Sequence, residues 1–192
     1  MRNLPTTLQT LGKDITREQL RYHQKRVLVA KEFTFDSAHH LHCYEGKCAI
    51  LHGHTYRLRV AVSGYPDDRG LVIDFADLKR IVKETIVDRL DHQYLNAVLP
   101  PMNTTAENMV VWMFEELEKA LAREGTPGLR VEEIVLWETP TSYAAVKREW
   151  MERREDAGTL PALHHGRRVG GIGPCARPGG VAAGAPSPCG AV

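Results

Sequence analysis

The segment Leu51-His52-Gly53-His54-Thr55-Tyr56-Arg57-Leu58-Arg59-Val60-Ala61-Val62-Ser63 sets the architecture that we expect for this chain. From His52 onward, every second residue is apolar, aromatic or histidine, which is the period of a β-strand with one buried face. The two arginines fall on the opposite face. Gly53 leaves that face bare between the two histidines, so that another backbone or a ligand can approach closely. We therefore expect a long strand that presents His52 and His54 on the same side.

Further strands and two helices are expected around this segment. Alternating patterns predict strands at residues 27–35, 129–137 and 143 to about 151. Apolar residues at steps of three and four predict one helix at 74–90 and a second that opens with Thr104-Thr105-Ala106-Glu107 and ends near Gly125. The order ββααββ predicts an α+β fold, with a four-stranded antiparallel sheet and both helices on one face. The edges of such a sheet are either protected or used for association.

The composition limits the domain organisation and the partners. The 192 residues fit one domain of residues 27–152, a polar N-terminal extension of residues 1–26, and a Gly/Pro-rich stretch of residues 157–192 that we expect to be a disordered tail. With 25 basic and 24 acidic residues, the chain gives no support for nucleic-acid binding. We find no apolar run that could span a membrane and no secretion signal. Four unevenly spaced cysteines do not resemble a disulfide framework, which favours the cytoplasm.

Three histidines form the first candidate site. His39 ends the segment Phe35-Asp36-Ser37-Ala38-His39, and His52 and His54 begin the strand that we expect beside it. Three imidazoles from neighbouring strands suit Zn²⁺ and leave its fourth coordination position open, which is the catalytic arrangement. Cys48, four residues before His52, would stand in or beside this site, where a nearby cation favours its thiolate. Alternatively, Cys48 is the fourth ligand of a closed, structural zinc site.

Other candidate residues lie later in the chain. Asp91 and His92 are adjacent at the end of the first predicted helix, where the helix dipole favours a protonated imidazole, although such pairs are common by chance. Glu138 ends the third predicted strand, and its carboxylate could accept two hydrogen bonds from a planar, amidine-like edge such as that of a pterin or guanine. A solvated glutamate is the alternative. Thr105 is a candidate substrate contact, or only a helix cap.

Taken together, these residues resemble the 6-pyruvoyl-tetrahydropterin synthase / 6-carboxytetrahydropterin synthase family. The resemblance covers about residues 30–147, and six motifs carry it in family order: residues 33–39, 47–56, 70–75, Leu90-Asp91-His92 with Leu95-Asn96, residues 103–108, and Trp137-Glu138-Thr139. The three residues between Cys48 and His52 resemble the 6-carboxytetrahydropterin synthase branch. The chain departs from the family at both ends and at Thr104, where proline is common.

The resemblance implies roles for the candidate residues. His39, His52 and His54 would be the zinc ligands, Cys48 the general base, His92 with Asp91 a proton relay, and Glu138 the anchor of the pterin ring. It also implies the tunnelling fold and a homo-oligomer, a hexamer built as a dimer of trimers, in which sheets join edge to edge. Active sites would then lie between subunits, with Asp91 and His92 beside the Cys48 of a neighbouring chain.

The implied reaction converts 7,8-dihydroneopterin triphosphate to 6-carboxy-5,6,7,8-tetrahydropterin, with release of acetaldehyde and triphosphate, in 7-deazapurine (preQ0/queuosine) biosynthesis. The alternatives are the pyruvoyl-type reaction and another cleavage of the dihydroneopterin side chain. A different class of answer is a non-catalytic zinc module that binds another protein.

Overall fold

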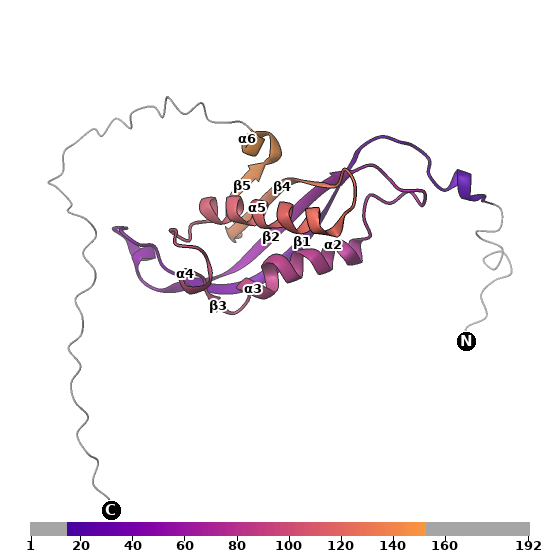
Figure 1. Cartoon of the computed structure of the whole chain (residues 1–192). Helices are drawn as coiled ribbons and strands as arrows, with labels where there is room; N and C mark the ends of the chain where they lie inside the picture. The colour runs from indigo at the N-terminus through magenta and orange to yellow at the C-terminus, as the bar shows by residue number, and fades with distance from the viewer. Residues whose placement is uncertain (1–14, 153–192) are drawn as a thin grey trace, which may run out of the picture. The chain divides into compact units, whose positions relative to one another are not determined.

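The computed structural model describes residues 15–152, and an α+β fold extends over most of them (Figure 1). The predicted tail at 157–192 and most of the predicted extension at 1–26 lie outside the described residues. The chain forms, in order, η1 (Arg17–Gln19), β1 (Val27–His39), η2 (Lys47–Ala49), β2 (His52–Gly64), α2 (Phe75–Val82), η3 (Lys83–Val87), α3 (Asp88–Leu90), β3 (Gln93–Tyr94), α4 (Leu95–Val98), α5 (Ala106–Glu124), β4 (Arg130–Thr139), β5 (Ser142–Lys147) and α6 (Arg148–Glu152).

The sheet is built around the long β1–β2 ladder. Its strand order is β3-β1-β2-β4-β5, and every pair is antiparallel except the short parallel pair of β1 with β3. β1 and β2 pair without interruption from Val27 with Gly64 to His39 with His52. Residues that face each other across this ladder share one side of the sheet. The register therefore decides which side chains meet the helices.

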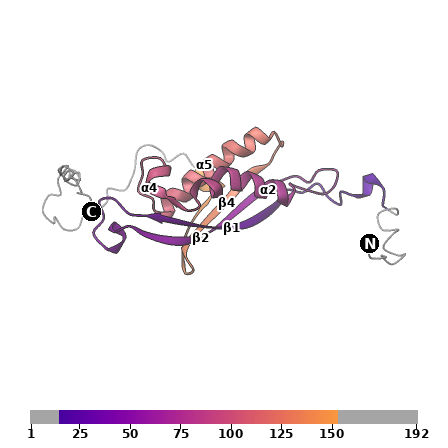
Figure 2. The same ribbon diagram turned by 90° about the horizontal axis from the view of Figure 1, so that it is seen from below.

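The helices lie on one side of the sheet, as Figure 2 shows from below. Asp74 caps the start of α2 by accepting a hydrogen bond from the amide of Ala76, and Thr105 caps α5 in the same way from the amide of Asn108. The core between helices and sheet includes fully buried Leu58, Met113 and Leu136. This packing holds the sheet face that carries the histidines against the first turn of α5.

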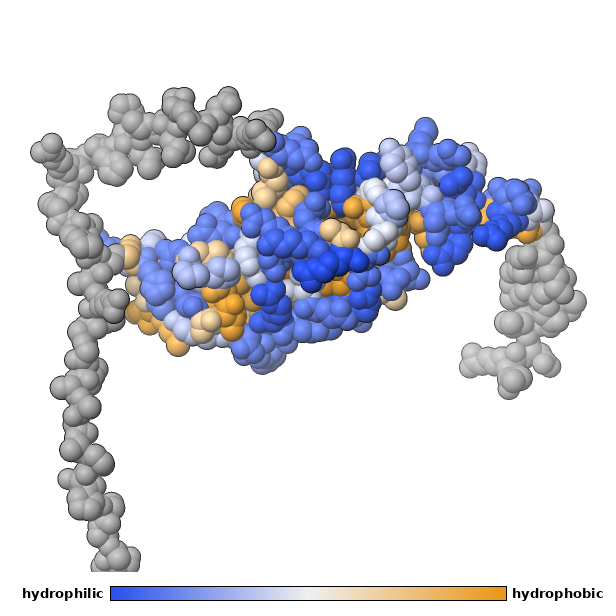
Figure 3. All heavy atoms as spheres, viewed as in Figure 1, coloured by the Kyte–Doolittle hydropathy of each residue, from blue (hydrophilic) through white to orange (hydrophobic). Residues whose placement is uncertain are grey.

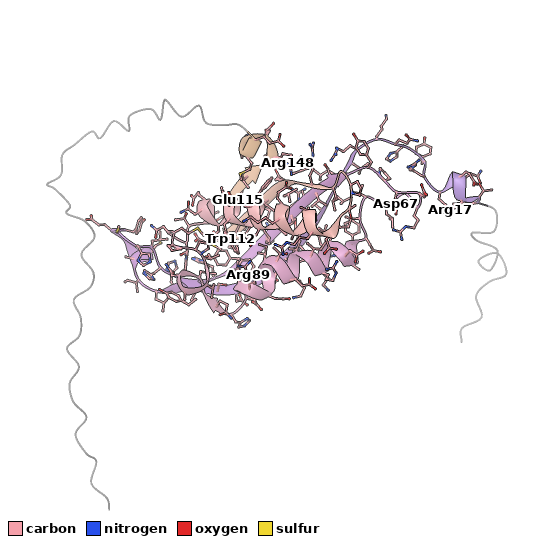
Figure 4. The ribbon with its side chains drawn as sticks, in the orientation of Figure 1. Arg17, Asp67, Arg89, Trp112, Glu115 and Arg148 are labelled. Carbon is pink, nitrogen blue, oxygen red and sulfur yellow. The ribbon has the colours of Figure 1, made fainter. Side chains whose placement is uncertain are left out.

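Ion pairs and a ring contact hold the middle of α5 to neighbouring helices. Arg89 of α3 lies over the ring of Trp112, at 5.0 Å from the ring centre (both are labelled in Figure 4). Arg89 also pairs with Glu116. Arg148, at the start of α6, pairs with Glu118. These contacts hold α5 to α3 and to α6.

Three local expectations need correction. The sheet has a fifth strand, β3, whose two residues are too few to show a period in the sequence. This strand forms because the His92 amide donates a hydrogen bond to the Asp36 carbonyl, which brings the chain alongside β1. The last strand ends at Lys147 and the helix α6 follows, so the strand predicted to reach Met151 is too long. The first predicted helix contains a π-helical stretch, η3, in its middle.

Apolar side chains are exposed around the turn between β1 and β2. Ile50 and Leu51 are 71% and 62% exposed, and Figure 3 shows apolar surface at this end of the sheet, in the left half of the view.

Within residues 15–152, no helix combines the length and the apolar composition that a membrane span requires.

Candidate active site

The three histidines lie together at the end of the β1–β2 ladder. His39 pairs directly with His52, and His54 is paired with Ser37, two positions along the same face. The ring centres are 4.5 Å apart for His39 and His52, 5.2 Å for His39 and His54, and 4.9 Å for His52 and His54. One nitrogen of each ring lies within 4.8 Å of the others. The structure thus brings together the three residues that the sequence singled out.

Hydrogen bonds fix the tautomers of two of these rings. Nδ1 of His39 lies 2.9 Å from the carbonyl oxygen of Thr104, and Nδ1 of His52 lies 2.8 Å from that of Ile50. Because a carbonyl oxygen only accepts, both Nδ1 atoms carry the proton and both Nε2 atoms keep a lone pair. Imidazoles that bind metals are commonly oriented by such contacts to backbone carbonyls.

His54 supplies a separate indication that a ligand belongs here. Its Nε2 is the one buried side-chain polar atom without a hydrogen-bond partner in the part of the chain that the structure describes. A buried polar atom without a partner is costly, and such atoms commonly mark a site for an ion or water. This atom faces the same space as the Nε2 of His39, since both lie close to the Glu138 carboxylate, at 3.8 and 3.5 Å. The donor set therefore fits a metal ion.

Burial sets the charge state of the cluster. Burial lowers the pKa of both His39 and His54, and this outweighs the opposing effect of the nearby Glu138 carboxylate. Neutral imidazole is the form that binds metals. Beneath the cluster, burial also raises the pKa of the Tyr56 hydroxyl, which lies 3.5 Å from Nε2 of His39. The lowered pKa of His39 and His54 thus favours the form of these two rings that can accept a cation.

A pocket of about 250 Å³ opens beside the histidines and contains most of the other candidates. It is lined by His39 and His52 together with Cys48, Thr105 and Glu138. Cys48 is a free, half-buried thiol in η2, and it lies outside the group of three ligand nitrogens. The pocket therefore joins a metal-type cluster, a thiol and a carboxylate within one chain.

His92 lies elsewhere, on a second pocket of about 570 Å³ that His54 also lines. Nδ1 of His92 is 3.0 Å from the Asp91 carboxylate, which also accepts the amide hydrogen of Asp36 at 3.0 Å. These hydrogen bonds lower the pKa of Asp91, the one from Asp36 most. His92 has a left-handed backbone (φ 56°) and an exposed side chain. Cys48 does not line this second pocket.

The structure adds residues to the first pocket that sequence reasoning missed. Leu41, Ala106, Glu107, Ser142 and Tyr143 complete its lining. In the sequence Glu107 indicates only a helix cap. The start of β5, which carries Ser142 and Tyr143, gives no signal of its own, because only its pairing with β4 brings it to the pocket.

The fold and the site define a class of protein: an α+β protein with a three-histidine cluster, suited to a metal ion, beside a pocket that holds a thiol and a carboxylate. The sequence model of 6-pyruvoyl tetrahydropterin synthase matches residues 28–149. The chain belongs to this family.

Individual relatives agree with this assignment. The chain is 40% identical over 139 residues to 6-carboxy-5,6,7,8-tetrahydropterin synthase of Haemophilus influenzae, a match that covers 60% of this chain and 94% of that protein. It is 36% identical over 118 residues to dihydroneopterin monophosphate aldolase of Pyrococcus furiosus, covering 61% and 92%. The solved structure of 6-pyruvoyl tetrahydropterin synthase from Caenorhabditis elegans superposes with a TM-score of 0.57 at 26% identity, covering 66% and 98%. The predicted resemblance to 6-carboxytetrahydropterin synthase is confirmed, and with it the prediction of an enzyme.

Proposed function

We propose that this enzyme converts 7,8-dihydroneopterin triphosphate to 6-carboxy-5,6,7,8-tetrahydropterin, with release of acetaldehyde and triphosphate, in 7-deazapurine (queuosine) biosynthesis. The observation that carries the proposal is the single pocket shared by Cys48, Glu138, His39 and His52. The relative from Haemophilus influenzae, which bears the name of this activity, supports it. The cytoplasm remains the predicted compartment.

The three histidines would hold Zn²⁺. Two observations support this assignment: the buried Nε2 of His54 has no hydrogen-bond partner, and carbonyl contacts at Nδ1 free the Nε2 atoms of His39 and His52. A bound Zn²⁺ supplies Lewis acidity toward substrate oxygens when three protein ligands leave a position open. Because the sulfur of Cys48 lies outside the ligand group, the geometry favours the open site over a closed structural one.

Two groups in the pocket would act on the substrate directly. Cys48 would remove a proton from carbon as the general base. The Glu138 carboxylate, 30% exposed and directed toward the histidines, would accept hydrogen bonds from the ring edge of the pterin and so fix its orientation. Thr105, which also caps α5, lines the same pocket and would contact the ring.

His92, oriented by Asp91, would relay protons from a neighbouring subunit. Within one chain His92 lines a different pocket from Cys48. A homo-oligomer that joins sheet edges would bring the two together, and the exposed Ile50 and Leu51 beside Cys48 support a contact there. The hexamer is part of this proposal.

The decisive experiment is turnover of 7,8-dihydroneopterin triphosphate by the purified protein, followed by mass spectrometry of the products. We expect 6-carboxytetrahydropterin and acetaldehyde with zinc present, loss of turnover after chelation, and recovery when zinc is restored. A zinc-loaded protein that leaves this substrate unchanged would refute the proposal.

A second candidate is cleavage of the dihydroneopterin side chain, which the relative from Pyrococcus furiosus, named an aldolase of dihydroneopterin monophosphate, favours. The same assay distinguishes it, because an aldolase leaves a one-carbon hydroxymethyl group on the pterin where the proposed reaction leaves a carboxylate. The pyruvoyl-type product retains three side-chain carbons, so its mass differs from the masses of both other products.

A further inference from the structure

Two asparagine side chains hold the residues that follow β1. Oδ1 of Asn96 accepts a hydrogen bond from the amide of His40 at 3.0 Å, and its Nδ2 donates to the carbonyl of His40 at 2.9 Å. Asn103 makes the same pair of bonds to His42, at 2.7 and 3.1 Å. Residues at i and i+2 of an extended chain direct their backbone groups to the same side. Each carboxamide thus takes the place of one residue of a neighbouring strand.

The opposite side of this segment bonds to Cys48. The amide of Leu41 donates to the carbonyl of Cys48 at 2.8 Å. Leu41 and Cys48 both line the pocket of the proposed active site. Residues 40–42 therefore follow His39 directly and contact the backbone of Cys48. The asparagines bond to one side of this segment, and Cys48 bonds to the other.

The asparagines are held in turn by the start of α5 and the residues before it. Nδ2 of Asn96 also donates to His42 Nε2 at 3.3 Å, and its Oδ1 accepts from the hydroxyl of fully buried Thr104 at 3.4 Å. The Asn103 carbonyl accepts from the side chain of Asn108 at 2.9 Å. Because backbone amides must face an oxygen and backbone carbonyls an NH₂ group, each carboxamide has only one workable orientation.

We infer that Asn96 and Asn103 are positioning residues that fix Cys48 relative to His39. The inference rests on the proposed function, in which Cys48 is the base and His39 a metal ligand. Neither asparagine lines the pocket, so neither contacts the substrate there. Their effect passes through the backbone of residues 40–42, which joins His39 to the partner of Cys48. No other described segment bonds to both asparagines and to the thiol-bearing turn.

The test replaces one amide donor at a time without changing side-chain size. Asn96→Asp and Asn103→Asp keep the acceptor for the backbone amide but set an oxygen against the carbonyl of His40 or His42. Gln24→Glu makes the same chemical change at an exposed residue and serves as the control. We expect about a 100-fold fall in kcat, the scale of a small misplacement of reacting groups, with KM within about threefold of the wild type. The control should match the wild type.

Two readouts separate positioning from general destabilisation. Zinc content should stay at one equivalent, while alkylation of Cys48, followed by mass spectrometry of its peptide, should become several-fold faster as the turn loosens. If an aspartate variant fails to fold, Asn96→Ala and Asn103→Ala remove the carboxamide donor without adding charge. Variants that lose melting temperature but keep kcat and the alkylation rate would overturn the inference.

Failure of the proposed function gives a different pattern. A wild-type protein without turnover would refute the reaction, whereas the alkylation comparison needs no substrate and still tests the positioning. Unchanged alkylation rates in active aspartate variants would refute the positioning alone.

Discussion

At the scale of single residues, the site combines three histidines on one face of the sheet with two carboxamides that hold the backbone beside them. His39, His52 and His54 could be found because strand period two and the expected neighbouring strand place them on one face. The carboxamides of Asn96 and Asn103 could not, because their partners are backbone atoms 56 and 61 residues away along the chain. The zinc role of the histidines and the catalytic roles of Cys48, Asp91, His92 and Glu138 remain predictions.

Removing the imidazole of His54 should abolish metal binding. His54→Ala deletes the buried nitrogen that lacks a partner and leaves only two ring ligands. We expect purified His54→Ala to hold less than about a tenth of an equivalent of zinc, since two ligands do not complete a zinc site. Elemental analysis measures this, and His23→Ala, a histidine outside the cluster, should keep one equivalent. One equivalent in His54→Ala would show that the assignment of three histidines is wrong.

Removing the thiol of Cys48 should separate metal binding from catalysis. Cys48→Ala lacks the proposed base but keeps all three ring nitrogens, so we expect full zinc content with kcat reduced at least about 100-fold. Zinc analysis and turnover on the same sample measure this. Loss of zinc together with activity would instead support Cys48 as a fourth ligand of a closed site.

At the scale of elements, the long strands and the two main helices were predictable because their periods extend over many residues. The predicted α+β class is confirmed, but β3 and α4 are too short to produce a periodic pattern, and they form through contacts to β1 that are distant in sequence. The same contacts carry Asp91 and His92 alongside Asp36, which no local pattern could indicate.

The close approach of β1 and β2 at Gly53 should prove sensitive to a single methyl group. A Cβ at Gly53 would lie 3.2 Å from the carbonyl oxygen of Ser37, between His52 and His54. We expect Gly53→Ala to push the strands apart and weaken zinc binding at least about tenfold, measured by competition with a chromophoric chelator. Gly125→Ala is the control: with φ of 67° at the end of α5, it should cost about 1 kcal/mol of stability and leave zinc affinity unchanged. Equal zinc affinity in both variants would contradict this.

At the scale of the whole molecule, one chain holds the proposed site in two parts. Cys48 lines one pocket and His92 another, and nothing in a single sequence shows how copies of the chain join. The sequence could therefore indicate an oligomer only through the family resemblance and the exposed sheet edges. The hexamer stays a prediction, which sedimentation analysis of the purified protein would test.

Mixing two inactive variants tests whether sites form between subunits. Cys48→Ala and His92→Ala should each be inactive. After the subunits are exchanged at equal ratio, random pairing across a shared interface gives about a quarter of the sites both intact groups. We expect recovery of up to that fraction of wild-type turnover per subunit. No recovery, with exchange confirmed by mass spectrometry of differently labelled subunits, would place Cys48 and His92 of one chain in the same site.

The pairing of His39 with His52 has a consequence for the dynamics of the hairpin. This pair is the final rung of the β1–β2 ladder, next to the twelve residues that connect the two strands. A terminal rung beside a long connection opens and closes most readily, and its amide hydrogens exchange early with solvent. An ion shared by His39, His52 and His54 would tie together the two strands at the point where the ladder otherwise begins to open. Exchange at this end of the hairpin would then report metal occupancy without any substrate.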